Sequence, residues 1–373
     1  MGVAILCAIF ASNTLQRWKS SLKHPVVLGA LAWWTIQALS ALYAPSIEWK
    51  EFSNHSWFYP LLIVSLFQHD DRWRYRAMWS FGIAMSLVLI ISWLQFFGVV
   101  PQTYAEPAWH NSVFKNYTQQ SIQTMAYCAM LGALLVTPQK LIRRHKIYAL
   151  LGIIIGLASV VIALGSRTTF IALLPLLLFW GIFLLREGSH KYRVAAFIFV
   201  ILSAVGMAAT WHLYPTQRER VLLAYTEAQE AMHTRAPTSI GIRMELWRQS
   251  IPIIQDAPIL GHGYHQWTPQ LLARTNNETN YEIYRSHPHQ EYLLIAAEQG
   301  LLGLAIYLGL LLALARYISR LPRPWCLFHG SLWVIFVTAG LANCLWVDAV
   351  HRHLFVLWLG SIPWLTPSRK STE

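Results

Sequence analysis

Two histidines that flank a proline form the segment of this sequence best suited to proton transfer. His287 and His289 lie on either side of Pro288, directly before an apolar run that begins at residue 291. A neutral imidazole titrates near neutral pH, so it can act as a general base toward an attacking hydroxyl group. A metal pair is one alternative, but metal sites usually have three or four ligands at recognisable spacing, and no third ligand lies nearby in the sequence. We therefore expect a general base and no metal, with simple packing of the rings as the remaining alternative.

Two arginines have the chemistry to bind phosphate groups. Arg167 lies between two apolar runs, where a charge is costly unless it is paired or faces water. Arg243 lies in a helical pattern over residues 240–255, four residues before Trp247 and on the same face. Each guanidinium is a planar fork of donors that matches phosphate oxygens. On one side of a membrane the pair would form a clamp for a diphosphate; the alternatives are an interfacial Arg167 and a solvated Arg243.

The composition indicates what kind of protein positions these residues. Of the 373 residues, 55% are hydrophobic and 12% are charged, which is about half the charged fraction of a soluble domain. The 18 Trp and 16 Tyr are also many, and such rings favour the headgroup level of a bilayer. The net charge of +12 comes from short clusters between apolar runs, which argues against a nucleic-acid partner. The sequence therefore predicts an all-α protein that crosses a membrane several times.

About eleven segments are apolar and long enough to be predicted as transmembrane helices, because roughly 20 apolar residues cross the hydrocarbon core. Every second connection between them carries a cluster of Lys and Arg, beginning with Arg17, Lys19 and Lys23. By the positive-inside rule these connections and the carboxyl terminus are cytoplasmic and Met1 is outside, so a longer relative would carry one more helix before Met1. The predicted spans are 1–15, 25–43, 57–68, 76–98, 119–137, 147–165, 168–186, 193–212, 291–315, 326–346 and 350–365.

A long outer connection divides the predicted chain into three parts. Residues 1–212 hold the first eight transmembrane helices, residues 213–290 form the loop, and residues 291–373 hold the last three helices and a cytoplasmic tail. With 78 residues, the loop is long enough for structure of its own. Its helical patterns cover 221–234 and 240–255, and a turn rich in Pro and Gly follows at Pro258, Gly261 and Gly263.

The other polar residues do not indicate a second kind of catalytic or cofactor-binding site. Glu298 lies inside the span predicted at 291–315 and needs a partner that the sequence does not name, while Asp348 can pair with Arg352. No G-x-S-x-G, Walker or dinucleotide motif is present, and the four Cys show neither metal nor disulfide spacing. We therefore expect no cofactor.

The histidine segment resembles a known family signature. His289-Gln290, nine residues, Gly300, two residues and Gly303 are similar to the H-[NSQ]-x9-G-x-x-G pattern of the O-antigen ligases. The resemblance implies that His289 is the catalytic residue. It also implies that Arg167 and Arg243 hold the pyrophosphate of a lipid donor. Residues in supporting roles would be Arg285, His287, Gln290, Gly300 and Gly303.

The family also implies an activity, partners and a location. Its members usually have twelve transmembrane helices and transfer O-antigen from undecaprenyl pyrophosphate to the lipid A-core oligosaccharide. The transfer takes place on the periplasmic face of the bacterial inner membrane, by metal-independent inversion. O-antigen polymerases and pilin O-oligosaccharyltransferases share the fold and motif, so they remain alternatives. A transporter of lipid-linked glycans would show inverted repeats, which the sequence lacks, and a non-catalytic assembly partner would not need the His and two Arg.

Overall fold

The computed structural model describes residue 19 and residues 21–45, 71–105, 109–137, 142–186, 190–233, 238–275 and 287–363; for a few helical residues it describes the backbone only. Within these ranges the chain is helical and contains no strand, which confirms the predicted all-α class. The helices are α3 (Pro25–Leu42), α6 (Asp71–Phe96), α7 (Tyr117–Leu135), α8 (Arg143–Ala158), the π-helical η2 (Ser159–Leu164), α9 (Arg167–Arg186), α10 (His190–Leu213), α11 (Pro215–His233), α12 (Ser239–Asp256), α13 (Trp267–Arg274), α14 (Glu291–Ile318), α15 (Arg323–Ala339) and α16 (Ala349–Ser361).

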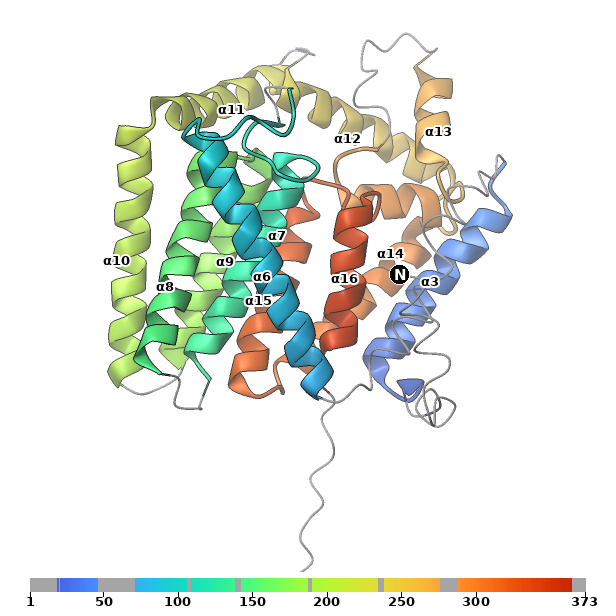
Figure 1. The fold of residues 1–373 in the computed structure, drawn as a ribbon. Coiled ribbons are helices and arrows are strands. Elements are labelled where there is room, and N and C mark those ends of the chain that lie inside the picture. Colours follow the sequence, from blue (N-terminus) through green and yellow to red (C-terminus); the bar gives the residue numbers. More distant parts are fainter. Residues whose placement is uncertain are drawn as a thin grey trace, which may run out of the picture.

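Most of the helices run along one direction as a bundle, while α11 and α12 cross its upper end (Figure 1). α7 is the most enclosed helix, because every residue from 119 to 133 is buried. Small residues let its neighbours approach closely: a Cβ at Gly156 of α8 would lie 2.6 Å from the Cys128 sulfur. Close backbone approach through small residues is typical of helix packing in membranes.

Five described helical segments are long and apolar enough to cross a membrane: Pro25–Leu42, Tyr75–Phe96, Arg143–Leu164, Thr168–Arg186 and Glu291–Ile318. Their outward faces carry exposed aliphatic side chains, such as Ile83, Ile154 and Leu178. The protein is therefore a multi-pass membrane protein. The predicted spans 1–15 and 57–68 lie outside the described residues, so the count of eleven stays a prediction.

One predicted span is wrong at its end. The sequence pattern of 326–346 reads as a continuous apolar helix, but α15 ends at Ala339. Residues 340–348 form an irregular connection, and α16 has only 13 residues. After the helix ends, the Leu341 and Ala342 N–H groups form tight turns with Thr338 and Ala339, and those of Leu345 and Trp346 donate to the Glu291 carboxylate.

The two ends of the bundle differ in charge. α8 begins at Arg143, α9 ends at Arg186 and α15 begins at Arg323, all at the end opposite α11 and α12 (Figure 1). This arrangement agrees with the alternation of basic connections along the chain. That the basic end is cytoplasmic remains an inference from the positive-inside rule.

α14 breaks at Gly300, whose φ of 68° and ψ of −174° are outside the helical region. A broken helix leaves backbone N–H and C=O groups open, and in apolar surroundings such groups must find partners within the protein. The backbone of the turn at 258–263 supplies them. Its bonds are His262 N to Ala297 O (3.0 Å), Gly263 N to Glu298 O (2.8 Å), Leu301 N to Pro258 O (2.8 Å) and Leu302 N to Ile259 O (3.2 Å).

The glycines on both sides allow this contact. A Cβ at Gly300 would lie 2.1 Å from the Ile259 oxygen, and one at Gly261 would lie 2.5 Å from the Glu298 oxygen. Both residues also have positive φ, 68° and 72°. The turn predicted at 258–263 and the Gly300 of the family signature therefore meet at one point of the fold.

Replacement of Gly300 by alanine should destabilise the protein far more than the same change at Gly309. A Cβ at Gly300 collides with backbone, and a non-glycine residue at such a φ/ψ costs about 1–3 kcal/mol by itself. A Cβ at Gly309, on the same helix, meets nothing within 4 Å. We expect Gly300→Ala to lower the Tm of the purified protein and Gly309→Ala to leave it unchanged or raise it. Equal Tm values would show that the break does not depend on glycine.

Candidate active site

The His287-Pro288-His289 segment forms a tight turn at the start of α14. His289 has a φ of 54°, which is uncommon for a residue other than glycine. Its backbone N–H donates to Nδ1 of His287 at 3.2 Å, and the two rings meet edge to face with centroids 4.2 Å apart. Since Nδ1 of His287 accepts this bond, the ring of His287 is neutral there. The bond holds the strained turn and fixes how the two imidazoles lie.

Both flanking helices support this turn. The indole N–H of Trp247, on α12, donates to the Pro288 carbonyl at 2.9 Å. Gln290 is the N-cap of α14, and its Oε1 accepts from the Leu293 N–H at 2.5 Å. A side-chain acceptor at this position satisfies one of the open N–H groups at the helix start. The turn is thus bound to α12 on one side and to α14 on the other.

Arg243 of α12 acts electrostatically on both histidines. Burial lowers the pKa of His287 to about 4, and the positive charge of Arg243 lowers it further. Burial, then His287 and Arg243, lower the pKa of His289 to about 2. Both rings are therefore neutral at neutral pH, the form in which an imidazole can accept a proton. The structure brings together Arg243, Trp247 and the histidine turn as three neighbouring parts of one site.

The connection between α15 and α16 is hydrogen-bonded to the first residue of α14. The Glu291 N–H donates to the Gly340 carbonyl at 2.8 Å, and Oε2 of Glu291 accepts from the N–H groups of Leu345 and of Trp346, the latter at 3.1 Å. Within this connection the side chain of Asn343 acts on His289 and raises the pKa of its imidazole, against the larger lowering by burial. Sequence analysis missed Asn343. The signal that could have found it is a polar amide inside an apparent transmembrane run, which is costly unless it has a partner.

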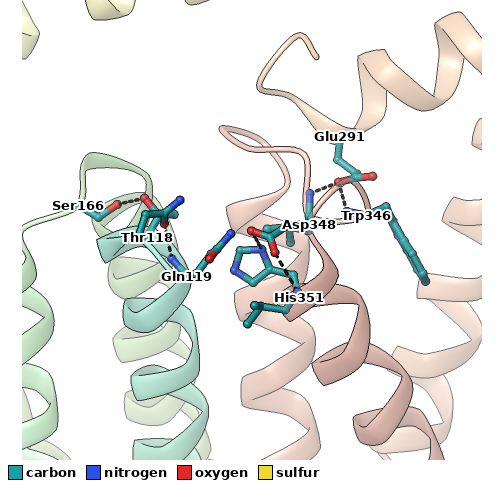
Figure 2. A network of polar contacts seen from close by, with 10 residues as sticks. Thr118, Gln119, Ser166, Glu291, Trp346, Asp348 and His351 are labelled. Carbon is teal, nitrogen blue, oxygen red and sulfur yellow. Dashed lines mark hydrogen bonds and ion pairs between the residues drawn. The ribbon is translucent and has the colours of Figure 1, made fainter. Parts of the chain in front are cut away.

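The turn that carries Arg167 lies at the same end of the bundle. Gly165, with a φ of 57°, ends η2, and the hydroxyl groups of Ser166 and Thr118 are hydrogen-bonded at 2.8 Å. Figure 2 shows this pair on one side and Glu291 on the other, with Asp348 and His351 between them. The side chain of Arg167 lies outside the described residues. The two-arginine clamp therefore remains a prediction.

The other predicted site residues have the following places. Arg285 lies outside the described residues. Gly300 and Gly303 lie in α14 beyond the turn, where a Cβ at Gly303 would be 2.3 Å from Cβ of Gln299. Both glycines therefore belong to the helix break and lie beyond the histidine turn.

Two carboxylates have partners that the sequence did not reveal. Glu298 is buried and accepts from the backbone N–H groups of His265 and Trp267. The expected pairing of Asp348 with Arg352 is wrong: Asp348 caps α16 by accepting from the Val350 N–H at 2.9 Å and lies 3.6 Å from His351. Arg352 acts on Glu291 instead.

A cavity lies between α3, α14 and α16, apart from the histidine turn. Its lining includes Glu291, Glu298 and Arg352 together with aromatic residues such as Trp33 and Phe355. Neither His289 nor Arg243 lines it. Two carboxyl groups and one guanidinium therefore share the lining of this cavity, apart from Arg243 and the histidine turn.

Comparisons with known proteins agree with the predicted resemblance. Residues 151–308 match the model of a family described as O-antigen ligase. A general O-oligosaccharyltransferase of Acinetobacter baylyi is 23% identical over 339 residues, which cover 85% of this chain and 56% of that protein. An O-antigen ligase of Pseudomonas aeruginosa is 24% identical over 205 residues, which cover 54% of this chain and 43% of that protein. The chain thus spans about half the length of the curated relatives it matches.

Replacement of Arg243 by glutamine should raise the pKa of both histidines, because it removes a positive charge that opposes their protonation. Arg248, exposed on the same helix and bonded to the Ala231 carbonyl at 2.9 Å, provides the matched control. The measurement is an NMR titration of ¹⁵N-labelled histidines. We expect higher pKa values in Arg243→Gln and unchanged values in Arg248→Gln. Identical titrations in both variants would contradict the electrostatic role of Arg243.

Proposed function

We propose, from the relationship of residues 151–308 to the O-antigen ligase family, that this protein is a membrane glycosyltransferase. In this proposal it transfers O-antigen glycan from undecaprenyl pyrophosphate to the lipid A-core oligosaccharide, on the periplasmic face of the bacterial inner membrane. The observation that carries the proposal is the convergence of Arg243 with the partly buried histidine turn at the start of α14, whose two imidazoles are neutral. Such a pairing of a cation with a base suits an anionic leaving group and a hydroxyl nucleophile.

His289 is the general base of the proposed reaction. Its imidazole takes the proton of an acceptor hydroxyl while that oxygen attacks the anomeric carbon of the donor sugar. The bond between this carbon and the pyrophosphate oxygen breaks on the opposite face, so the configuration inverts. Undecaprenyl pyrophosphate leaves with the bonding electrons, and Arg167 and Arg243 stabilise the negative charge that develops on it.

The charge of Arg243 also couples donor binding to base strength. In the empty site this charge lowers the pKa of His289, which makes the ring a weak base. A pyrophosphate bound at Arg243 brings negative charge that offsets this effect and raises the pKa of the imidazole. The base is then strong enough only when the donor is in place. After transfer, the imidazolium lies beside the anionic product, with which it forms a favourable charge pair.

α11 and α12 are well placed to orient the glycan of the donor. α11 and α12 lie over the end of the bundle where the histidine turn is located (Figure 1). In the proposal they orient the donor sugars above Arg243, and orientation of two reactants is itself a large part of catalysis. The positive-inside rule supports a cytoplasmic location for the basic opposite end, so in the proposal the turn and these helices face the periplasm.

A protein hydroxyl is the second candidate acceptor. The relative that covers 85% of this chain is described as a general O-oligosaccharyltransferase, whereas the O-antigen ligase covers 54%. The proposed base and clamp would serve a serine hydroxyl as well as a sugar hydroxyl, because both are alcohols of similar acidity. Polymerisation of O-antigen uses the same bond chemistry and differs only in the acceptor.

The function is tested by complementation of a bacterial strain that lacks its own O-antigen ligase. Wild type and His233→Ala, which alters an exposed histidine at the end of α11, should restore the lipopolysaccharide ladder. His289→Ala should abolish it, since loss of a general base costs about 10²–10⁴ in rate. Membrane levels of the three proteins are compared by immunoblot. A ladder in His289→Ala would remove this residue from the chemistry. A glycosylated acceptor protein without a ladder would shift the proposal to the protein hydroxyl.

The reaction should not depend on a divalent cation, because in the proposal the guanidinium groups supply the positive charge that a metal would otherwise give. We expect purified protein to retain its rate of glycan transfer after exhaustive chelation. Addition of Mg²⁺ or Mn²⁺ should not increase that rate. A loss on chelation that a divalent cation restores would disprove the metal-free mechanism.

A further inference from the structure

We propose that the cavity between α3, α14 and α16 is a binding site for a sugar ring, an assignment that builds on the proposed transfer of a glycan. One face of the first part of α14 forms a wall of this cavity, since its lining residues recur at spacings of three and four along the helix. They are Glu291, Leu294, Ile295, Glu298 and Gln299. Three of these five side chains are polar. Polar residues inside a transmembrane helix are costly, and they commonly mark the site or path of a substrate.

Four buried polar atoms of the lining residues have no hydrogen-bond partner in the part of the chain that the structure describes. They are Nε1 of Trp33, Oε1 of Glu291, Oε1 of Gln299 and Nε of Arg352. Arg352 is the most exposed of these four residues, at 6%. Folded proteins leave few buried polar atoms without a partner, so each such atom calls for an explanation. A ligand in the cavity explains why four of them line the same place.

The chemistry of these atoms indicates the class of ligand. Trp33 and Arg352 offer N–H donors, whereas Glu291 and Gln299 offer oxygen acceptors. An ammonium group offers only donors and a phosphate dianion only acceptors, so either would leave two of the four atoms without a partner. A hydroxyl group both donates and accepts, and a sugar ring carries several of them. A sugar ring can therefore serve both kinds of atom.

Aromatic side chains form much of the remaining lining: Trp33, Trp34, Trp346 and Phe355. The rings of Trp33 and Trp346 lie 6.1 Å apart between centroids, and those of Trp346 and Phe355 lie 4.8 Å apart, edge to face. Such rings offer large apolar faces, against which the C–H groups of a sugar ring can pack. The empty volume, including the open mouth of the cavity, is about 840 Å³. This volume is typical of small-molecule sites, which measure about 300–1,000 Å³.

The cavity begins at the end of α14 where the proposed base lies. Glu291 is the first residue of α14 and follows His289 by two positions. Its other carboxylate oxygen, Oε2, accepts from the N–H groups of Leu345 and Trp346. These bonds fix the carboxylate and leave Oε1 for the ligand. In the proposed reaction the bound ring belongs to a glycan whose reacting end lies at His289. Donor and acceptor both carry sugars, so either of them can supply the ring.

The first test measures binding without catalysis, in purified protein in lipid nanodiscs. The probes are the core oligosaccharide released from lipopolysaccharide and the O-antigen glycan released from its lipid carrier. Trp33→Phe removes one donor and keeps an aromatic ring, and Gln299→Met removes one acceptor. Each change should raise the Kd of one of the two glycans by about 3- to 10-fold, the usual effect of one hydrogen bond. The matched controls Trp79→Phe and Leu312→Met alter exposed residues of α6 and α14 and should leave both Kd values unchanged.

Steady-state kinetics of the same variants identifies the source of the ring. The KM of the acceptor should rise if the ring belongs to the core oligosaccharide, and the KM of the donor if it belongs to O-antigen, with little change in kcat. Unchanged Kd and KM in both variants, with normal transfer, would overturn the sugar site and leave the proposed function standing. A wild type that binds neither glycan would overturn the site as well. Raised Kd in protein that transfers no glycan would keep the site and reject the proposed function. If Gln299→Met does not fold, Trp33→Phe decides.

Discussion

A break in a membrane-embedded helix exposes backbone groups that lipid cannot satisfy, and the rest of this site depends on how α14 meets that constraint at Gly300. The turn at 258–263 supplies four backbone hydrogen bonds to the broken helix. That turn directly follows α12, so the same bonds fix where α12 lies. Arg243 and Trp247 reach the histidine turn because α12 is held there. A contact made entirely by backbone atoms thus places the side chains that carry the proposed chemistry.

The electrostatics of the site follow from this placement. Burial of the two imidazoles, together with the charge of the partly exposed Arg243, keeps both rings neutral. In the proposed reaction His289 becomes a stronger base when the anionic donor binds beside it. The carboxyl groups nearest to this site have partners of their own. Glu245 of α12 pairs with Arg248, and Glu291 accepts from the backbone N–H groups of Leu345 and Trp346.

The sequence predicted the parts of this site that have a local pattern. The helix at 240–255, the turn at 258–263 and the family signature around His289 each depend on nearby residue types, and the first two are present as predicted. What it could not predict depends on distant contacts. Residues 340–346 are apolar enough to be predicted as helix, whereas in the structure the N–H groups of Leu345 and Trp346 donate to the distant carboxylate of Glu291. The partner of Glu298 is backbone, which has no sequence signal. The clamp role of Arg167 and the supporting role of Arg285 stay predictions.

The first part of α14 has a consequence for how this chain can change in evolution. Residues 291–299 form a short rod that is bound at both ends: Glu291 to the connection after α15, and Gly300 to the turn at 258–263. One residue inserted or deleted in this rod would rotate one end against the other by about 100°, because an α-helix has about 3.6 residues per turn. His289 would then face away from Arg243. The nine-residue spacing of the signature therefore sets how one end of this segment is rotated relative to the other. The protein should tolerate substitutions within the segment far better than insertions or deletions.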